Sequence, residues 1–218
     1  MEQRTAREVT IPMQTIQEKE KKVTGFFSRK FYYAFRALFH PVTRLLILLH
    51  VTPNMVTVLS MVFGAAAGFM FAQNRLWAGM VYGYFMAFAD IVDGQLAKAT
   101  GTESRFGGVL DSAVDRYTEF FIFGGLGIRY YTLGELPWTL LCAVAFINSV
   151  MVSYVKARAE AEGFDCNVGR FQRPERLAFL AVGLAFGGIL LDVAIMIIAF
   201  GALFTVFRRL RHVWRQNK

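Results

Sequence analysis

The sequence is short of charged residues and of cysteine. Asp, Glu, Lys and Arg together make up 18% of its 218 residues, below the roughly 25% that is usual in soluble domains. Its two cysteines, Cys142 and Cys166, cannot build a disulfide framework, and free thiols in a reducing setting are the simplest interpretation. The shortage of cysteine therefore excludes a disulfide-built scaffold, and the shortage of charge argues against an ordinary soluble enzyme.

Apolar residues, by contrast, are abundant. They account for 55% of the chain, which contains 22 Phe and has a mean hydropathy of +0.40. This composition excludes intrinsic disorder, and 19 glycines are too few for a collagen-like repeat. The length allows a compact domain of several helices. We therefore predict an all-α integral membrane protein.

Six stretches are candidates for membrane-spanning helices, which need about 20 mostly apolar residues. The last two are short and divided only by Asp192, so one very long helix is an alternative interpretation. Gly187 and Gly188, together with Asp192, favour a turn there. A GxxxG spacing from Gly64 to Gly68 in the first stretch indicates close helix packing. The predicted spans cover residues 54–72, 77–93, 106–130, 137–155, 177–191 and 193–207.

Positive charges are distributed unevenly among the segments that join these stretches. All but three of the 24 Lys and Arg residues lie before the first stretch or after the second, fourth or sixth. The exceptions are Arg75 and Arg129, in the other segments, and Arg116, within the third stretch. Because positively charged loops tend to stay in the cytoplasm, we predict that both termini are cytoplasmic, which agrees with an even number of spans.

The flanking regions are polar or basic. Residues 1–24 have no continuous apolar stretch, so we expect a polar leader rather than a secretory signal. Residues 25–51 interleave aromatic with basic side chains and are predicted to form an interfacial amphipathic helix; a solvated basic leader is the alternative. A six-helix transmembrane domain would then cover residues 52–207, and a basic cytoplasmic tail residues 208–218.

Four carboxylates lie in stretches where an isolated one costs at least about 2.5–3.5 kcal/mol to insert. Asp90 and Asp93 differ by about 60° around a helix and so share a face. Asp111 and Asp115 also share a face, with Gly107 four residues earlier. Both pairs lie near the short loop between the second and third spans, so we expect the two faces to meet.

Clustered carboxylates with little His or thiolate nearby select hard cations such as Mg²⁺, Mn²⁺ or Ca²⁺. The small residues Gly94 and Ala97 leave open space beside the first pair. Buried salt bridges with Lys98, Arg105 or Arg116 are one alternative interpretation, and an ion or proton pathway is another. We favour a divalent-metal site because the four acids gather at one depth, beside glycines.

The complete pattern resembles the signature of the CDP-alcohol phosphotransferases. That family has Arg at the position of Lys98, where lysine keeps the charge but loses the planar fork of a guanidinium. Six spans and a basic interfacial helix at the N-terminus also fit what the family shows. In this chain the pattern reads Asp90-x2-Asp93-Gly94-x2-Ala97-Lys98-x8-Gly107-x3-Asp111-x3-Asp115.

The resemblance implies an enzyme that transfers a substituted phosphoryl group from a CDP-linked lipid, such as CDP-diacylglycerol, to an alcohol, with release of CMP. It also implies two divalent ions, Mg²⁺ or Mn²⁺, and a homodimer surrounded by membrane lipids; nucleic acid is not an expected partner. The implied metal ligands are Asp90, Asp93, Asp111 and Asp115, of which Asp115 is also the implied catalytic base. The implied nucleotide-binding residues are Asn54, Thr57, Gly94, Ala97, Lys98 and Gly107.

A second basic stretch bears on the acceptor alcohol. Residues 153–161 read SYVKARAEA and residues 170–176 read RFQRPER, similar to stretches of bacterial phosphatidylinositol-phosphate synthases, with Gln172 in place of an acidic residue. The resemblance implies a phosphorylated polyol as acceptor, above all inositol 1-phosphate. Glycerol 3-phosphate or another polyol, a plain positive-inside loop, and a membrane transporter are the alternatives. The implied acceptor-binding residues are Lys156, Arg158, Arg173 and Arg176.

Overall fold

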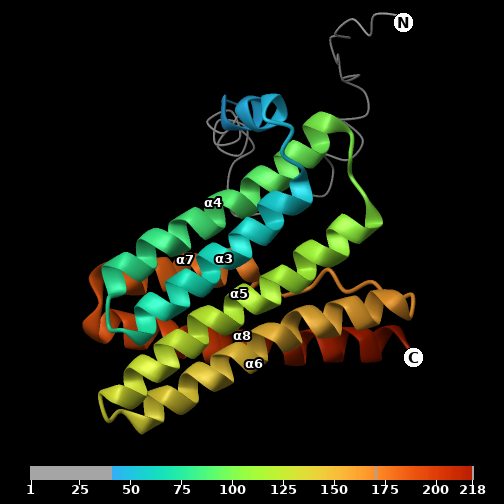
Figure 1. Ribbon diagram of the computed structural model, residues 1–218. Coiled ribbons are helices and arrows are strands. Elements are labelled where there is room, and N and C mark those ends of the chain that lie inside the picture. Colours follow the sequence, from blue (N-terminus) through green and yellow to red (C-terminus); the bar gives the residue numbers. More distant parts are fainter. Residues whose placement is uncertain (1–40, 170, 218) are drawn as a thin grey trace, which may run out of the picture. The chain divides into compact units, whose positions relative to one another are not determined.

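The computed structural model describes residues 41–169 and 171–217 (Figure 1). The predicted polar leader, most of the predicted interfacial helix, and Arg170 lie outside these residues. Within the predicted interfacial segment, residues 41–48 are helical, and a turn follows in which His50 has a φ of 54°. Val42–Lys218 form one compact unit, and all helices named below belong to it.

The described part of this unit is built from helices and contains no strand. The prediction of an all-α protein is therefore confirmed. Cys142 and Cys166 are both buried and free, as the composition suggested. The long helices are α3 (Pro53–Ala72), α4 (Leu76–Thr100), α5 (Arg105–Thr132), α6 (Leu136–Ala161), α7 (Arg173–Phe186) and α8 (Gly188–Gln216).

Local signals in the sequence fix where three of these helices begin. Thr52 caps α3, where its side-chain oxygen accepts a backbone hydrogen bond at 3.4 Å. Ser104 caps α5 and accepts the N–H of Gly107 at 2.9 Å. α7 begins with a capping box, in which the Glu175 carboxylate accepts the N–H of Gln172 at 3.1 Å. Each of these starts lies beside residues of the candidate site described below.

The break between the last two helices differs from the prediction. α7 ends at Phe186 and α8 begins at Gly188, whereas we expected the break at Asp192. Gly187 and Gly188 have φ values of 65° and 50°, which glycine adopts without steric cost. Asp192 lies inside α8, where its carboxylate accepts a hydrogen bond from the Tyr130 hydroxyl of α5. The two glycines therefore separate the helices. The predicted boundary at Asp192 is wrong, and so is the alternative prediction of a single long helix.

The helices pack as neighbours in space that are not always neighbours in sequence. α3 packs on both α4 and α5, α6 packs on α5 and α8, and α7 packs on α8 and more lightly on α4 (Figure 1). α3 and α5 approach especially closely, because a Cβ at Gly68 would lie 2.1 Å from the backbone oxygen of Phe121. A Cβ at Gly125 would lie 2.0 Å from that of Gly68. This close packing, predicted from the GxxxG spacing, is confirmed and holds α5 against α3.

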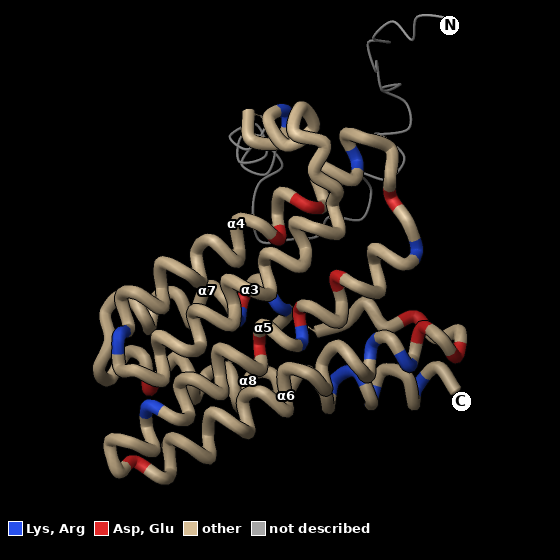
Figure 2. Tube along the Cα trace, in the orientation of Figure 1, with Lys and Arg blue, Asp and Glu red and all other residues tan. Residues whose placement is uncertain are grey.

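Three helices among the described residues, α3, α6 and α8, are long and apolar enough to cross a membrane. Figure 2 shows long stretches without charge along them. Many of their apolar side chains face outward; Ile189 of α8, for example, is 77% exposed. α7 has only 14 residues, and α4 and α5 carry the carboxylates of the candidate site. Six crossings therefore remain a prediction.

Candidate metal and substrate site

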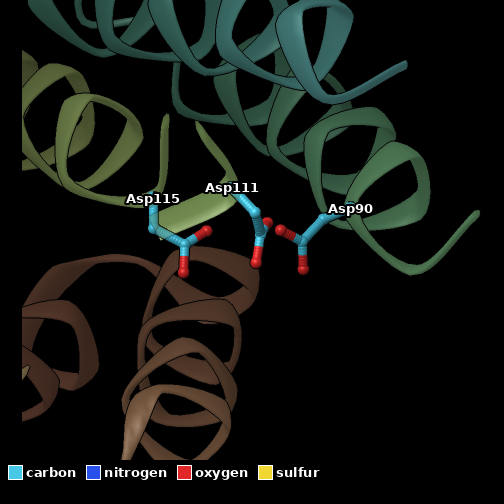
Figure 3. Close-up of side chains that lie close together, drawn as sticks. All are labelled: Asp90, Asp111 and Asp115. Carbon is cyan, nitrogen blue, oxygen red and sulfur yellow. The ribbon is translucent and has the colours of Figure 1, made fainter. Parts of the chain in front are cut away.

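Three carboxylates from two helices come together in the bundle. Asp90 lies on α4, and Asp111 and Asp115 lie one turn apart on α5. One oxygen of each lies within 4.8 Å of the other two, and the side chains gather around a common space (Figure 3). Asp115 is buried, whereas Asp90 and Asp111 are half-buried. Oxygen donors at this spacing suit a hard divalent cation.

Asp93, the fourth predicted metal ligand, has a different partner. Its carboxylate is buried and accepts a hydrogen bond from the Thr57 hydroxyl of α3 at 2.5 Å. Thr57 also lies 3.1 Å from the carbonyl oxygen of Pro53. The structure thus joins two predicted site residues to each other, Asp93 to Thr57, and leaves Asp93 outside the group of three carboxylates.

A guanidinium lies among the three carboxylates. Arg173, the first residue of α7, places its Nη1 3.0 Å from Oδ1 of Asp90 and 2.7 Å from Oδ1 of Asp115. The same nitrogen lies 3.2 Å from the second oxygen of Asp90. We predicted Arg173 as an acceptor-binding residue and did not expect this contact with the acids.

The alternative of buried salt bridges holds for one of the three cations that we considered. Nη2 of Arg116 lies 3.3 Å from Oδ2 of the neighbouring Asp115. Lys98 and Arg105 are exposed and form no salt bridge with another described residue. Arg116 and Arg173 together leave the three carboxylates with an excess of negative charge, which a divalent cation would neutralise.

The predicted nucleotide-binding residues lie along the starts of α3 and α5 and the second half of α4. A Cβ at Gly107 would lie 3.5 Å from Oδ1 of Asn54, so these two residues are close. A Cβ at Gly94 would meet no atom within 4 Å, which leaves open space beside α4. Ala97 is half-buried and Lys98 is exposed. The space next to the acids that the small residues predicted is therefore present.

A cavity of about 460 Å³ opens beside Asp115. It lies between the middle of α5, the second half of α6, the start of α7 and the end of α8, and most of the charged groups that line it are positive. Asp115 therefore belongs to the carboxylate group and also lines the cavity. The lining cations are Arg116, Lys156, Arg173, Arg176 and Arg209, and the lining acids are Asp115 and Glu160.

The four predicted acceptor-binding residues occupy different positions around this cavity. Lys156 and Arg173 line it and are partly exposed. Arg176 lines it too, but is buried, and its Nη2 lies 2.6 Å from Oε1 of the buried Glu119. Arg158 is not among the lining residues; its side chain is 63% exposed and pairs with Glu162, which follows the end of α6.

Two residues of this region were missed by reasoning from the sequence. Arg209, which we placed in the cytoplasmic tail, is buried in α8 and donates to the carbonyl oxygens of Val152 and Val168. Its spacing from Ala202 and Val206 continues an apolar helix face, which could have revealed this from the sequence. Glu119 lies one turn after Asp115 and could have been recognised by the same spacing.

Comparisons with known proteins identify the family to which the chain belongs. Residues 50–207 match the family model of the CDP-alcohol phosphatidyltransferases. The phosphatidylinositol phosphate synthase of Corynebacterium glutamicum is 37% identical over 183 residues, which cover 80% of this chain and 83% of that protein. The synthase of the same name from Mycobacterium tuberculosis strain H37Rv is 31% identical over 191 residues, which cover 83% of this chain and 88% of that protein.

Solved structures of the Mycobacterium tuberculosis enzyme resemble this one. The crystal structure of its complex with manganese and citrate superposes with a TM-score of 0.73 at 31% identity, over 80% of this chain and 88% of that one. The structure with CDP-DAG bound gives the same TM-score and identity, over 80% and 92% of the two chains. Because residues 50–207 match the family model and the relatives above are this similar, the chain is a transferase of the CDP-alcohol phosphatidyltransferase family.

Proposed function

We propose that this enzyme transfers the phosphatidyl group of CDP-diacylglycerol to inositol 1-phosphate and releases CMP. The names of its relatives and the CDP-DAG-bound structure of one of them support this choice of donor and acceptor. Membership of a transferase family argues against the transporter that we considered as an alternative.

The observation that carries the choice of acceptor is the basic cavity beside Asp115. Arg and Lys recognise phosphate through charge-assisted hydrogen bonds, and a neutral alcohol or serine would need fewer cations. The cavity volume of about 460 Å³ lies in the range that is usual for small-molecule sites. In our proposal Lys156, Arg173 and Arg176 hold the acceptor phosphate, and its hydroxyl group faces Asp115.

Asp90, Asp111 and Asp115 have the donor set for Mg²⁺ or Mn²⁺, and Asp93 is the proposed further ligand if two ions bind. The position of the Arg173 guanidinium supports this fit, because the same oxygens already accommodate a positive charge. A bound divalent cation would neutralise charge on the pyrophosphate of the donor.

Asp115 is the proposed general base because it is one of the three clustered carboxylates and also lines the cavity. Its carboxylate would accept the proton of the acceptor hydroxyl as that oxygen forms a bond to the phosphorus next to diacylglycerol. The bond between this phosphorus and the bridging oxygen breaks, and the electron pair leaves with CMP.

The nucleotide would lie beside the open face of α4. Gly94 and Ala97 leave room there, and the exposed Lys98 is placed to meet a phosphate. Asn54, Thr57 and Gly107 would border the same space from α3 and α5. We further propose six membrane crossings, a site and two termini that face the cytoplasm, and a homodimer.

The proposed function can be tested with the full-length protein in detergent–lipid micelles. CDP-diacylglycerol, Mn²⁺ or Mg²⁺ and a panel of alcohols would be supplied, with CMP as the readout. We expect the fastest release with inositol 1-phosphate, and none in EDTA. Faster release with glycerol 3-phosphate would reassign the acceptor within the same reaction, and robust release in EDTA would contradict the metal site.

A further inference from the structure

Arg173 occupies two places that the proposed reaction needs for different purposes. Its Nη1 contacts Asp90 and Asp115 at 2.7 to 3.2 Å, where a divalent cation is proposed to bind. Its side chain also lines the basic cavity, where the acceptor phosphate is proposed to bind. One guanidinium cannot make its best contacts with both groups at once.

The contact with the carboxylates uses only part of the guanidinium. All three distances involve Nη1, and Nε is buried without a hydrogen-bond partner among the described residues. A bidentate pair, the strong form of Arg–carboxylate interaction, would use two nitrogens. A cation that binds the carboxylates more strongly, or an anion that binds the guanidinium more strongly, can therefore replace the contact of Arg173 with Asp90 and Asp115.

The main chain at Arg173 is held while its long side chain can turn. The capping box of Gln172 and Glu175 fixes the first turn of α7, and Pro174 restricts the backbone further. Exchange between the two sites thus needs a change of side-chain rotamer and no movement of the helix.

A divalent cation and this guanidinium would compete for the same oxygens. A dication among Asp90, Asp111 and Asp115 takes over the neutralisation that Arg173 provides, and it repels a positive charge about 3 Å away. The released guanidinium would then add a donor to the cavity that Lys156 and Arg176 already line.

We propose that Arg173 couples metal binding to acceptor binding by exchanging between the carboxylates and the acceptor phosphate. This inference rests on the proposed function, because it takes the carboxylates as the metal site and the cavity as the phosphate site. Binding of the metal frees the guanidinium for the anion, and binding of the anion holds the guanidinium away from the metal site. By thermodynamic linkage each ligand must then strengthen the other by the same factor.

The test is Mn²⁺ binding by the full-length protein in detergent without any CDP-lipid, followed through the electron paramagnetic resonance signal of free Mn²⁺. Inorganic phosphate serves as the anion, with a protein-free titration to correct for Mn²⁺–phosphate complexes. For the wild type we expect phosphate to lower the Kd for Mn²⁺ by a factor on the order of 5 to 150, the usual size of such coupling. If phosphate leaves the Kd of the wild type for Mn²⁺ unchanged, the proposal is wrong, and no variant is needed to show it.

Two substitutions separate exchange from simple charge effects. Without phosphate, Arg173→Gln and Arg173→Ala should bind Mn²⁺ more tightly than the wild type, because no guanidinium competes, and phosphate should no longer tighten binding. Arg208→Ala removes a charge from an exposed position of α8 and should behave like the wild type. Tightening by phosphate that persists in both Arg173 variants contradicts the exchange, because the anion then acts on the metal directly.

The proposed function has a separate readout in CMP release by the same wild-type preparation. Active enzyme without phosphate–Mn²⁺ coupling would refute the exchange and leave the proposed function standing. Coupling without CMP release from any alcohol would support the exchange and refute the proposed function.

Discussion

Asp192 and Asp115 both lie in helices of the same bundle, yet their carboxylates have different surroundings. Asp192 accepts a hydrogen bond from the Tyr130 hydroxyl, whose ring stacks on Trp138 at 6.0 Å between centroids. Asp115 contacts the neighbouring Arg116 and shares the Arg173 guanidinium with Asp90, and Asp111 adds a third carboxylate within 4.8 Å. The single carboxylate of Asp192 is satisfied by one donor and joins two helices, whereas three clustered carboxylates outnumber the two guanidinium groups beside them and can bind a further cation.

The largest effect should come from removing one carboxylate of the group of three. Asp115→Asn removes the proposed base as well as a metal ligand, so we expect CMP release to fall by a factor of about 10²–10⁴ or more. Asp192→Asn is the matched change outside the site and should leave CMP release per folded molecule unchanged. Equal losses of activity in the two variants would erase the distinction between the two kinds of carboxylate.

Removal of the shared cation should act on the acceptor more than on the donor. Arg173→Ala should raise the KM for inositol 1-phosphate by roughly 10- to 150-fold, which corresponds to a lost charged hydrogen bond of about 1.5–3 kcal/mol. The KM for CDP-diacylglycerol should change much less. Arg173→Lys should restore only part of the loss, because a point charge lacks the planar fork, and Arg158→Ala should have a smaller effect, because Arg158 lies outside the cavity lining.

The Tyr130–Asp192 hydrogen bond should matter for stability and not for chemistry. Tyr130→Phe leaves the half-buried Asp192 carboxylate without this donor and should lower the free energy of unfolding by about 1–3 kcal/mol. Thermal unfolding in detergent would measure this loss, and kinetic assays on the folded fraction should give an unchanged kcat. A lower kcat at unchanged stability would indicate that this end of the bundle takes part in the reaction.

Substitution of Lys98 should have the smallest effect when the charge is kept. Lys98→Arg restores the fork that the family has at this position, so we expect activity to be retained and the KM for CDP-diacylglycerol to be equal or lower. Lys98→Ala should raise that KM, while the KM for the acceptor stays the same. An unchanged KM in Lys98→Ala would remove this residue from the proposed nucleotide site.

Local patterns in the sequence predicted the parts of the fold that depend on neighbours along the chain. The one-turn spacing of Asp111 and Asp115 placed both on one face of α5, and the GxxxG spacing at Gly64 and Gly68 predicted close helix packing, which the structure shows to be with α5. Both follow from helix geometry alone. Even so, the helix break was placed at Asp192, a few residues late: Gly187, Gly188 and Asp192 were all taken as part of one turn, and only the positive φ values of the two glycines show which of them make it.

Contacts between distant parts of the chain were not predictable in the same way. Asp93 lies 36 residues from Thr57, and Asp90 lies 83 residues from Arg173. Which of two acids on one helix face meets a hydroxyl, and which meets a cation, depends on how α3 and α7 pack against α4. Counting positive charges gave a predicted orientation of the chain in the membrane, but it did not distinguish the exposed Arg208 from the buried Arg209.

Arg209 has a consequence for how the cavity attracts its ligand. Two of its nitrogens, Nε and Nη1, already donate to the carbonyl oxygens of Val168 and Val152, so this side chain is fixed by the main chain of α6 and of the loop after it. Its charge nevertheless borders the cavity and contributes a positive potential that no rearrangement is needed to create. A phosphorylated alcohol would therefore be drawn into a field that is built into the fold before any side chain turns to meet it.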